Sequence, residues 1–205
     1  MPGSRSADRF PSHKGGTIRL ARREDAGPCL AIYAPVVEEG AVSFEFSPPA
    51  PEEMESRIAG VLEFAPWLVL EEGGEVAAYA YGTRFRERAA YGWTVETAVY
   101  VATRARGRGA GRRLYGVLLE ALRLQGFRSA VAVITLPNPP SLRLHAALGF
   151  ERAGLLEAVG FKHGRWHDVE VVSLRLIPGS SAPAPIVPMR ELVACADFHA
   201  LLGAG

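Results

Sequence analysis

The sequence predicts an α/β fold, or an α+β fold with a mixed sheet, in a single domain. A length of 205 residues suits one domain, and an apolar share of 48% is ordinary for a chain that buries a core. Segments with strand-like patterns are intermixed along the chain with segments of helical spacing. One strand-like segment, residues 129–136 (SAVAVITL), is apolar throughout, which is typical of a strand covered on both faces.

The first third of the chain contains one predicted strand and two predicted helices. Residues 17–21 (TIRLA) alternate like a strand, and Asp25 then takes the N-cap position of a helix with regularly spaced apolar residues. Pro35 lies inside that helix and lacks an N–H, so we expect it to kink or end the helix. A Pro-rich turn at 47–51 leads into the second helix, near 52–64.

The middle of the chain predicts a hairpin, a further strand and a glycine-rich loop. Residues 67–72 and 76–85 have strand patterns, and Gly73–Gly74 between them favours a hairpin turn. The next strand, at 93–101, runs directly into RARGRGAGRR (104–113), where five arginines alternate with three glycines. This loop therefore follows directly after an ordered element.

Beyond the loop the pattern becomes helical and then returns to strands. Residues 111–125 have an apolar face at helical spacing, and Gly126 is placed to cap the end of that helix. A short helix around 141–148 is ended by the glycine that follows it. Two final strands are predicted near 150–161 and 166–176.

The two ends of the chain differ in composition from the centre. Residues 1–16 mix Gly, Pro, Ser and charged residues without periodicity, which predicts a disordered head. Residues 177–205 begin as a Pro-rich linker and end in a tail, where 189–202 has the pattern of a short amphipathic helix. We interpret this helix as a packing or dimer arm. The folded domain is expected at 17–176.

Composition also argues against several classes of protein. Cys29 and Cys195 are too few for a disulfide framework or a conventional zinc site, and we expect no metal. No apolar run approaches the ~18 residues of a membrane span, and the N-terminal segment lacks the apolar core of a secretory signal. We therefore expect a soluble protein of a reducing cytoplasm that has no membrane partner.

The arginine–glycine stretch has two interpretations: a flexible basic arm for nucleic acid, or a loop folded around one small polyanion. The net charge is only +1, whereas nucleic-acid domains usually carry a general excess of positive charge. Glycines allow several backbone N–H groups to point at one anion, and a helix N-terminus adds unpaired donors and a positive dipole end. The loop lacks the Gly-Lys-Ser/Thr of a P-loop and the glycine spacing of a dinucleotide fingerprint. We therefore predict a phosphate or diphosphate cradle and no nucleic-acid partner.

Two motifs resemble a known family. Arg106, Gly109 and Gly111 match the pattern Arg/Gln-x-x-Gly-x-Gly/Ala, and NPPSLRLHAALGF (138–150) follows downstream. Together they resemble the GCN5-related N-acetyltransferase (GNAT) superfamily, whose central strands splay apart.

Three further segments narrow the resemblance to the phosphinothricin N-acetyltransferase branch of that superfamily. They are AYGWTVETAVYV (90–101), GFRSAVAVITLPNPPS (126–141) and GFKHGRWHDV (160–169). The likeness covers roughly residues 17–176. It implies acetyl-CoA as the donor, a small amino-acid substrate whose primary amine is the acceptor, and a homodimer.

The resemblance implies a set of coenzyme-binding residues. One strand segment would pair its backbone with the pantetheine arm, the glycine-rich loop would hold the diphosphate, and an asparagine would contact the coenzyme. These residues are Val99, Tyr100, Val101, Gly107, Arg108, Gly109, Ala110, Gly111, Arg112 and Asn138. The arginine side chains are expected to stay solvated and to steer the anionic coenzyme. Alternatively, Asn138, which precedes a proline, serves only to form a turn.

Two residues are candidates for proton transfer. The acceptor amine is an ammonium at neutral pH and must lose a proton before it can attack the thioester. Glu96 lies among apolar strand residues, so burial is expected to raise its pKa and make it a better base. By resemblance, His145 faces the active site and orients the acceptor or transfers a proton to the leaving thiolate. The alternatives are a structural ion pair for Glu96 and a core or surface role for His145.

The resemblance also implies an acceptor site. Arg86 and Arg88 fall where basic substrate contacts are expected, and a guanidinium suits a carboxylate or phosphinate. Alternatively, both are solvated surface residues. The other residues assigned to the site are Phe44, Tyr91, Tyr100, Thr135 and, as a weaker suggestion, Val169. Thr135 stands where a glycine is expected, so it intrudes on the pocket or offers a hydroxyl.

The resemblance therefore implies an enzyme that acetylates the α-amine of phosphinothricin, or of a close amino-acid analogue, by direct attack. Methionine sulfoximine and methionine sulfone are the natural alternative acceptors. Polyamines, aminoglycosides and peptide amines would prefer acidic pockets, and Arg86 and Arg88 argue against them. Two further hypotheses are a nucleic-acid-binding module built on 104–113 and a non-catalytic coenzyme A sensor.

Overall fold

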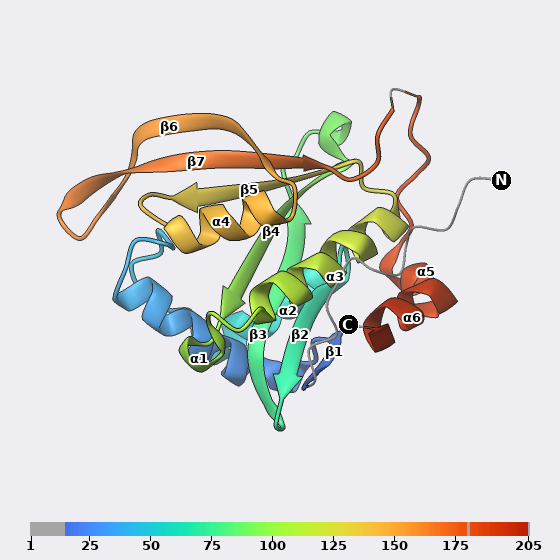
Figure 1. Cartoon of the computed structure of the whole chain (residues 1–205), viewed down its shortest axis with the longest axis horizontal. Helices are drawn as coiled ribbons and strands as arrows, with labels where there is room; N and C mark the ends of the chain where they lie inside the picture. The colour runs from blue at the N-terminus through green and yellow to red at the C-terminus, as the bar shows by residue number, and fades with distance from the viewer. Residues whose placement is uncertain (1–14, 180, 205) are drawn as a thin grey trace.

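The computed structural model describes residues 15–179 and 181–204 and shows one mixed sheet with helices on both faces (Figure 1). Its seven strands lie in the order β1-β2-β3-β4-β5-β7-β6, and only β4 and β5 run parallel. The strands are β1 (Thr17–Leu20), β2 (Trp67–Glu72), β3 (Glu75–Arg84), β4 (Thr94–Val101), β5 (Ser129–Thr135), β6 (Glu151–Lys162) and β7 (Arg165–Arg175). The predicted mixed α/β class is confirmed. Most of the predicted disordered head, residues 1–14, lies outside the described residues.

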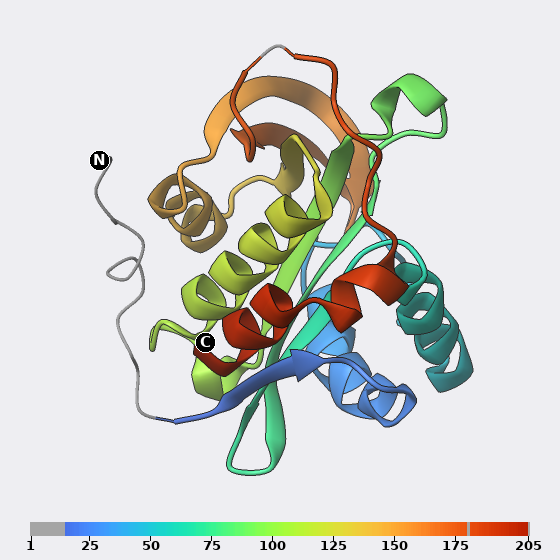
Figure 2. The ribbon, with the colours of Figure 1, turned by 90° about the vertical axis from the view of Figure 1, so that its right-hand side faces the viewer.

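The helices form a layer on each side of the sheet (Figure 2). They are α1 (Ala26–Glu38), α2 (Pro51–Leu62), α3 (Ala110–Gln125), α4 (Pro139–Ala147), α5 (Met189–Ala194) and α6 (Ala196–Ala204). Helices α1 and α2 cover one face, and α3 packs against the other. Strand β2 is buried on both faces: Trp67 and Val69 belong to the α1–α2 core, whereas Leu68 and Leu70 belong to the α3 core.

The two parallel strands separate soon after they pair. Strand β4 pairs with β5 only over Thr94–Glu96, but it continues alongside β3 as far as Val101. At this point the Thr97 hydroxyl lies 3.1 Å from the Val131 carbonyl of β5 and 2.6 Å from the Tyr115 hydroxyl of α3. Because a carbonyl can only accept, Thr97 donates to β5 and Tyr115 donates to Thr97. The expected splay of the central strands is therefore confirmed, and buried hydroxyls brace it.

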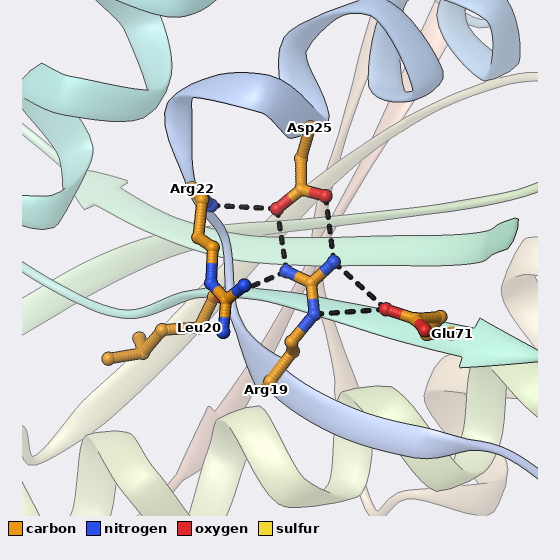
Figure 3. Close-up of polar contacts among 5 residues, drawn as sticks. All are labelled: Arg19, Leu20, Arg22, Asp25 and Glu71. Atoms are coloured by element: carbon orange, nitrogen blue, oxygen red, sulfur yellow. Dashed lines mark hydrogen bonds and ion pairs between the residues drawn. The ribbon is translucent and has the colours of Figure 1, made fainter. Parts of the chain in front are cut away.

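A cluster of charges fixes the passage from β1 to α1. Figure 3 shows the Arg19 guanidinium between Asp25 and Glu71, with bonds of 2.7 and 2.9 Å to Asp25 and of 3.0 and 3.1 Å to Glu71. Asp25 also accepts from the Arg22 backbone N–H at 2.7 Å. Burial alone would raise the pKa of Asp25, but these hydrogen bonds outweigh it and hold the pKa below its ordinary value. The predicted N-cap role is wrong for the side chain, because Asp25 sits at that position without capping α1.

Two further local predictions differ from the structure. Helix α1 does not end at Pro35, which corrects that part of the prediction: it continues to Glu38, because the buried Val37 anchors its last turn and Glu39 N–H donates to the Pro35 carbonyl at 3.0 Å. Strand β5 is not covered on both faces along its whole length, since Val133 is 48% exposed.

The C-terminal segment contributes to the main core. Leu192 of α5 and Phe198 of α6 are buried in the same core as α3. The Gln125 side chain, at the end of α3, donates to the Val187 carbonyl at 3.1 Å. The segment that the sequence assigned to a linker and tail thus covers the outer side of α3.

Candidate functional site

A cleft opens where β4 and β5 separate, and it collects residues from three elements. Val99 and Tyr100 come from β4, Thr135 ends β5, and Asn138 and His145 belong to the start and the body of α4; all five line one small cavity. The sequence assigned each of these residues to the site. The structure therefore brings together residues that lie up to 46 positions apart at the point where the sheet opens.

The backbone of β4 is open along the cleft. Ala102 N–H donates to the Ala77 carbonyl of β3 at 2.9 Å. Because every second residue of an antiparallel strand bonds to its neighbour, the backbone N–H and C=O groups of Val99 and Val101 point away from β3. The Val101 carbonyl accepts from the Arg106 side chain at 3.1 Å. Strand β5 has left the ladder here. The N–H and C=O of Val99 thus face a gap that an extended amide-containing chain could fill.

The glycine-rich loop forms a cradle at the start of α3. Gly107 and Gly109 have φ of 71° and 83°, a conformation that favours glycine. Gly109 is the N-cap residue and no side-chain hydrogen bond caps the helix there, so the first backbone N–H groups of α3 are available to an anion. A β-carbon on Gly111 would lie 3.1 Å from Val101, which keeps the first turn close to the end of β4.

The arginines of this loop are mostly turned outward. Arg108 and Arg112 are exposed, whereas Ala110 is buried at the first position of α3. Exposed guanidinium groups around a cradle of N–H groups raise the local concentration of anions without holding one fixed geometry.

Glu96 lies at the last paired position before the strands separate. It faces Thr83 of β3 and Val131 of β5, and it is half-buried. Its neighbour Val95 points into the α3 core, so Glu96 points toward the α1–α2 face. Burial raises the pKa of Glu96 above its ordinary value, and the charge of Arg86 partly offsets that rise. Glu96 is therefore a carboxylate with increased proton affinity beside a cation.

His145 has one bonded and one unbonded ring nitrogen. Nδ1 lies 2.8 Å from the Ser141 carbonyl, which can only accept, so Nδ1 carries the proton. Nε2 is buried and has no hydrogen-bond partner among the described residues. Burial lowers the pKa of His145, although the bond to Ser141 works to raise it. The neutral ring, packed against Tyr115 and Phe150, thus offers a lone pair at Nε2.

Asn138 and Thr135 have structural partners as well as a place in the cleft. The Asn138 side-chain oxygen accepts from the Ser141 N–H at 3.2 Å and so caps α4. This capping bond uses the oxygen and leaves the amide NH₂ of Asn138 as a donor. Thr135 is 8% exposed and pairs with Val169 of β7.

The predicted acceptor residues are distributed over two loops. Arg86 lies in the β3–β4 connection, close enough to act on the charge of Glu96. Arg88 and Tyr91 are exposed on the same connection, and no described contact links them to Glu96. Phe44 lies on the loop between α1 and α2 and packs against the β6–β7 hairpin. The structure thus joins only Arg86 directly to the candidate base.

The sequence pattern did not lead us to predict one aromatic cluster near Glu96. Trp67, Tyr79 and Tyr81 stack side by side on the α1–α2 face, with ring centroids 4.3 to 6.2 Å apart. They line a cavity of about 340 Å³ whose wall also contains Thr83, the β3 partner of Glu96. Tyr79 and Tyr81 are two positions apart in a strand, and this period could have indicated a shared aromatic face.

The described residues contain neither a membrane-spanning helix nor a cluster of metal ligands. None of the helices they form combines the length and the apolar character that crossing a bilayer requires. Within residues 15–179 and 181–204, no group of three His, Cys, Asp or Glu side chains is placed to hold a metal ion.

The chain matches the family model described as an acetyltransferase (GNAT) domain over residues 18–171. It is 40% identical over 182 residues to the phosphinothricin N-acetyltransferase of Streptomyces viridochromogenes, covering 89% of this chain and 99% of that one. It is also 42% identical over 119 residues to the L-methionine sulfoximine/L-methionine sulfone acetyltransferase of Pseudomonas aeruginosa, covering 58% and 69%.

A solved structure is similar over most of the fold. The crystal structure of a GNAT superfamily phosphinothricin acetyltransferase from Sinorhizobium meliloti, in complex with AcCoA, superposes with a TM-score of 0.79 at 38% identity. The match covers 83% of this chain and 94% of that one.

Proposed function

The chain belongs to the acetyltransferase (GNAT) family, and from that premise we propose that it transfers the acetyl group of acetyl-CoA to the α-amine of phosphinothricin or a close amino-acid analogue. The observation that carries this proposal is the position of Glu96. It is a half-buried carboxylate at the point where two parallel strands part, on the same strand that carries the open backbone groups of Val99 and leads into the glycine-rich loop. We assign the catalytic part to residues 17–176.

Glu96 serves as the general base in this proposal. It accepts a proton from the acceptor ammonium, directly or through one water, and the free amine can then attack. Its raised pKa makes it a stronger proton acceptor than an exposed glutamate. The attack is direct, without an acyl-enzyme. Consistent with this, Cys29 is fully buried and burial raises the pKa of its thiol to about 12, so it is a poor nucleophile.

The residues around the cleft fit acetyl-CoA, which would supply the acetyl group as an activated thioester. The N–H groups of 107–112 would hold the diphosphate, and the Asn138 amide would donate to the coenzyme. The backbone of Val99 would pair with the amides of the arm. One β4 N–H would also stabilise negative charge that develops on the acetyl oxygen.

His145 assists at the other side of the cleft. Its lone pair at Nε2 can accept a hydrogen bond from the acceptor amine, which would orient that amine. After taking up a proton, the same nitrogen can donate it to the departing thiolate. His145 lines the cleft and its Nε2 has no hydrogen-bond partner among the described residues, which supports either role.

Acceptor choice depends on a cation and on room for the side chain. Arg86 provides a fork for a carboxylate or phosphinate beside Glu96, and Arg88 is proposed to help it. Phe44, Tyr100 and Val169 are proposed as the apolar walls, and Tyr91 as a further contact of the acceptor. Methionine sulfoximine and methionine sulfone remain second candidates, supported by the 42% identity to a relative with that activity. Thr135 lines the cleft, where its hydroxyl would bias the choice.

We also propose a homodimer. Strand β6 is the edge of the sheet, and its hairpin with β7 exposes large apolar side chains. They are Leu156, Val159, Phe161 and Trp166, each 49% to 63% exposed. A second copy would cover this surface. Sedimentation of the wild type and of Trp166→Asp tests this: a dimer and a monomer are expected, and a monomeric wild type would contradict it.

The cellular role follows from the chemistry. Acetylation removes the charge of the phosphinothricin amine, so cells that make this enzyme should tolerate the compound. The two cysteines are unpaired, which favours a reducing compartment such as the cytoplasm.

The test is thiol release from acetyl-CoA with a panel of acceptors. Phosphinothricin, methionine sulfoximine and methionine sulfone should release thiol, whereas a polyamine and an aminoglycoside should not. Thiol release that is confined to the cationic acceptors would overturn the proposal. Binding to nucleic acid that weakens steeply with salt, in the absence of thiol release, would favour a nucleic-acid module instead.

A further inference from the structure

Apart from Val169, which is assigned to the acceptor site, the segment GFKHGRWHDV (160–169) takes no part in the chemistry proposed above. It forms the end of the β6–β7 hairpin. In Figure 1 this end lies beside the loop between α1 and α2, residues 39–50. We call residues 39–50 the α1–α2 loop; it carries Phe44, a proposed wall of the acceptor site.

Lys162 joins the hairpin to the last turn of α1 and to the α1–α2 loop. It is only 2% exposed, and its ammonium donates to the Val37 carbonyl at 2.6 Å and to the Ser43 carbonyl at 2.8 Å. Val37 lies in the last turn of α1, where carbonyls lack helical partners and the helix dipole favours a cation. Among the described residues no carboxylate forms an ion pair with Lys162. The two carbonyls therefore compensate for burial of the ammonium.

Other residues of the segment reinforce this attachment. The His163 Nε2 donates to the Gly40 carbonyl at 3.2 Å, and the His167 Nε2 donates to the Lys162 carbonyl at 3.1 Å. The Phe44 ring lies over Gly160, where a β-carbon would come within 2.2 Å of it. The hairpin is thus shaped to receive Phe44.

The α1–α2 loop is also attached to both helices. Tyr33 of α1 and Ser43 share a hydrogen bond of 2.7 Å, and Arg57 of α2 donates to Glu45 at 2.8 Å. The charges of Glu45 and Glu96 both act on the hydroxyl of Tyr81. The loop therefore lies beside the face of the sheet that carries the proposed base.

From these contacts we infer that Lys162 is a positioning residue: it clasps the α1–α2 loop to the β6–β7 hairpin and so sets the acceptor-binding surface. The inference rests on the proposed function for the identity of the acceptor site. Lys162 itself does not touch the reacting atoms in this scheme.

Lys162→Met tests the clasp, because it keeps the length of the side chain and removes the donors. The KM for the acceptor should rise about tenfold, as expected for the loss of a charged hydrogen bond, while the KM for acetyl-CoA stays within twofold. Arg165→Met is the matched control, since Arg165 pairs with Lys162 across the hairpin and is exposed. A folded Lys162→Met protein with an unchanged acceptor KM, or with both KM values raised equally, would overturn the inference.

A second pair of variants leaves Lys162 in place. Gly160→Ala should raise the acceptor KM because its β-carbon displaces the Phe44 ring. Gly154→Ala, on the same strand with open space around it, should not. If Lys162→Met fails to fold, this pair decides the question: equal acceptor KM values in the two variants would overturn the inference.

Hydrogen exchange measures the clasp without any substrate. The amides of 39–46 should exchange faster in ligand-free Lys162→Met than in wild type or Arg165→Met. Unchanged exchange would overturn the clasp even if the enzyme is active. A wild type without acetyltransferase activity but with this exchange difference would instead overturn the proposed function and leave the attachment standing.

Discussion

The hydrogen bond between the buried hydroxyls of Thr97 and Tyr115 leads to a prediction about stability. A second substitution should recover part of the free energy of unfolding that the first one loses. Thr97 is 4% exposed; its hydroxyl accepts from Tyr115 at 2.6 Å and donates to the Val131 carbonyl at 3.1 Å. Thr97→Val keeps the shape of the side chain but deprives two buried polar groups of this partner. The brace at the point where β4 and β5 separate is then lost.

The expected magnitudes follow from the number of groups left unsatisfied. A buried polar group without a partner costs about 1–3 kcal/mol, so Thr97→Val, which leaves two such groups, should lower the free energy of unfolding by about 2–6 kcal/mol. Tyr115→Phe alone should lower it by about 1 kcal/mol, because Thr97 keeps its bond to Val131. In the double variant no tyrosine hydroxyl needs a partner. That protein should therefore be more stable than Thr97→Val by about 1 kcal/mol.

Denaturant unfolding of the wild type, the two single variants and the double variant measures this cycle. Thr97→Ser is the control, since it keeps the hydroxyl and should stay closer to wild type than Thr97→Val. The reasoning is refuted if the losses of the two single variants simply add in the double variant, because the hydroxyls would then not act as a pair.

Three other predictions concern separate parts of the chain. Arg86→Met should move the acid limb of the kcat/KM profile to higher pH, because burial then raises the Glu96 pKa unopposed; an unmoved limb would contradict their pairing. Asp25→Asn should destabilise the fold by about 2 kcal/mol at neutral pH. The difference in stability from wild type should be fully present above the unfolded-state pKa of about 4, and it should vanish as the pH falls through the lower folded-state pKa of Asp25. A difference in urea unfolding that does not change with pH would count against this prediction. Gly109→Ala should weaken coenzyme A binding in calorimetry about tenfold, because alanine resists a φ of 83°; the helical control Gly60→Ala should not.

Local pattern was enough to predict most of the fold. Helical spacing predicted 111–125, and α3 spans Ala110–Gln125. Gly73–Gly74 predicted the β2–β3 turn, and both glycines have positive φ. Gly107 and Gly109 pointed to a loop with special backbone geometry for the same reason. These features depend on residues close together in the chain, where period and glycine content carry the information.

Contacts between distant segments could not be predicted in this way. Lys162 bonds to carbonyls 119 and 125 residues away, and Arg19 meets Glu71 across the β1–β2 ladder. Such partners depend on strand order and register, which local periodicity does not contain. The burial of Phe198 likewise depends on α6 packing against the outer side of α3, which is a contact between distant segments. His145 was placed in the site through the family resemblance, but its unpartnered Nε2 became visible only in three dimensions.

The rate of thiol release by Glu96→Gln, with phosphinothricin as the acceptor, tests the central claim most directly. Glutamine keeps the shape of the side chain but cannot take the amine proton. At pH 7 the account predicts a fall in kcat/KM of about 10²- to 10⁴-fold, as for the loss of a general base. A variant that retains the wild-type rate would contradict the assignment of Glu96 as the base at the parting of β4 and β5.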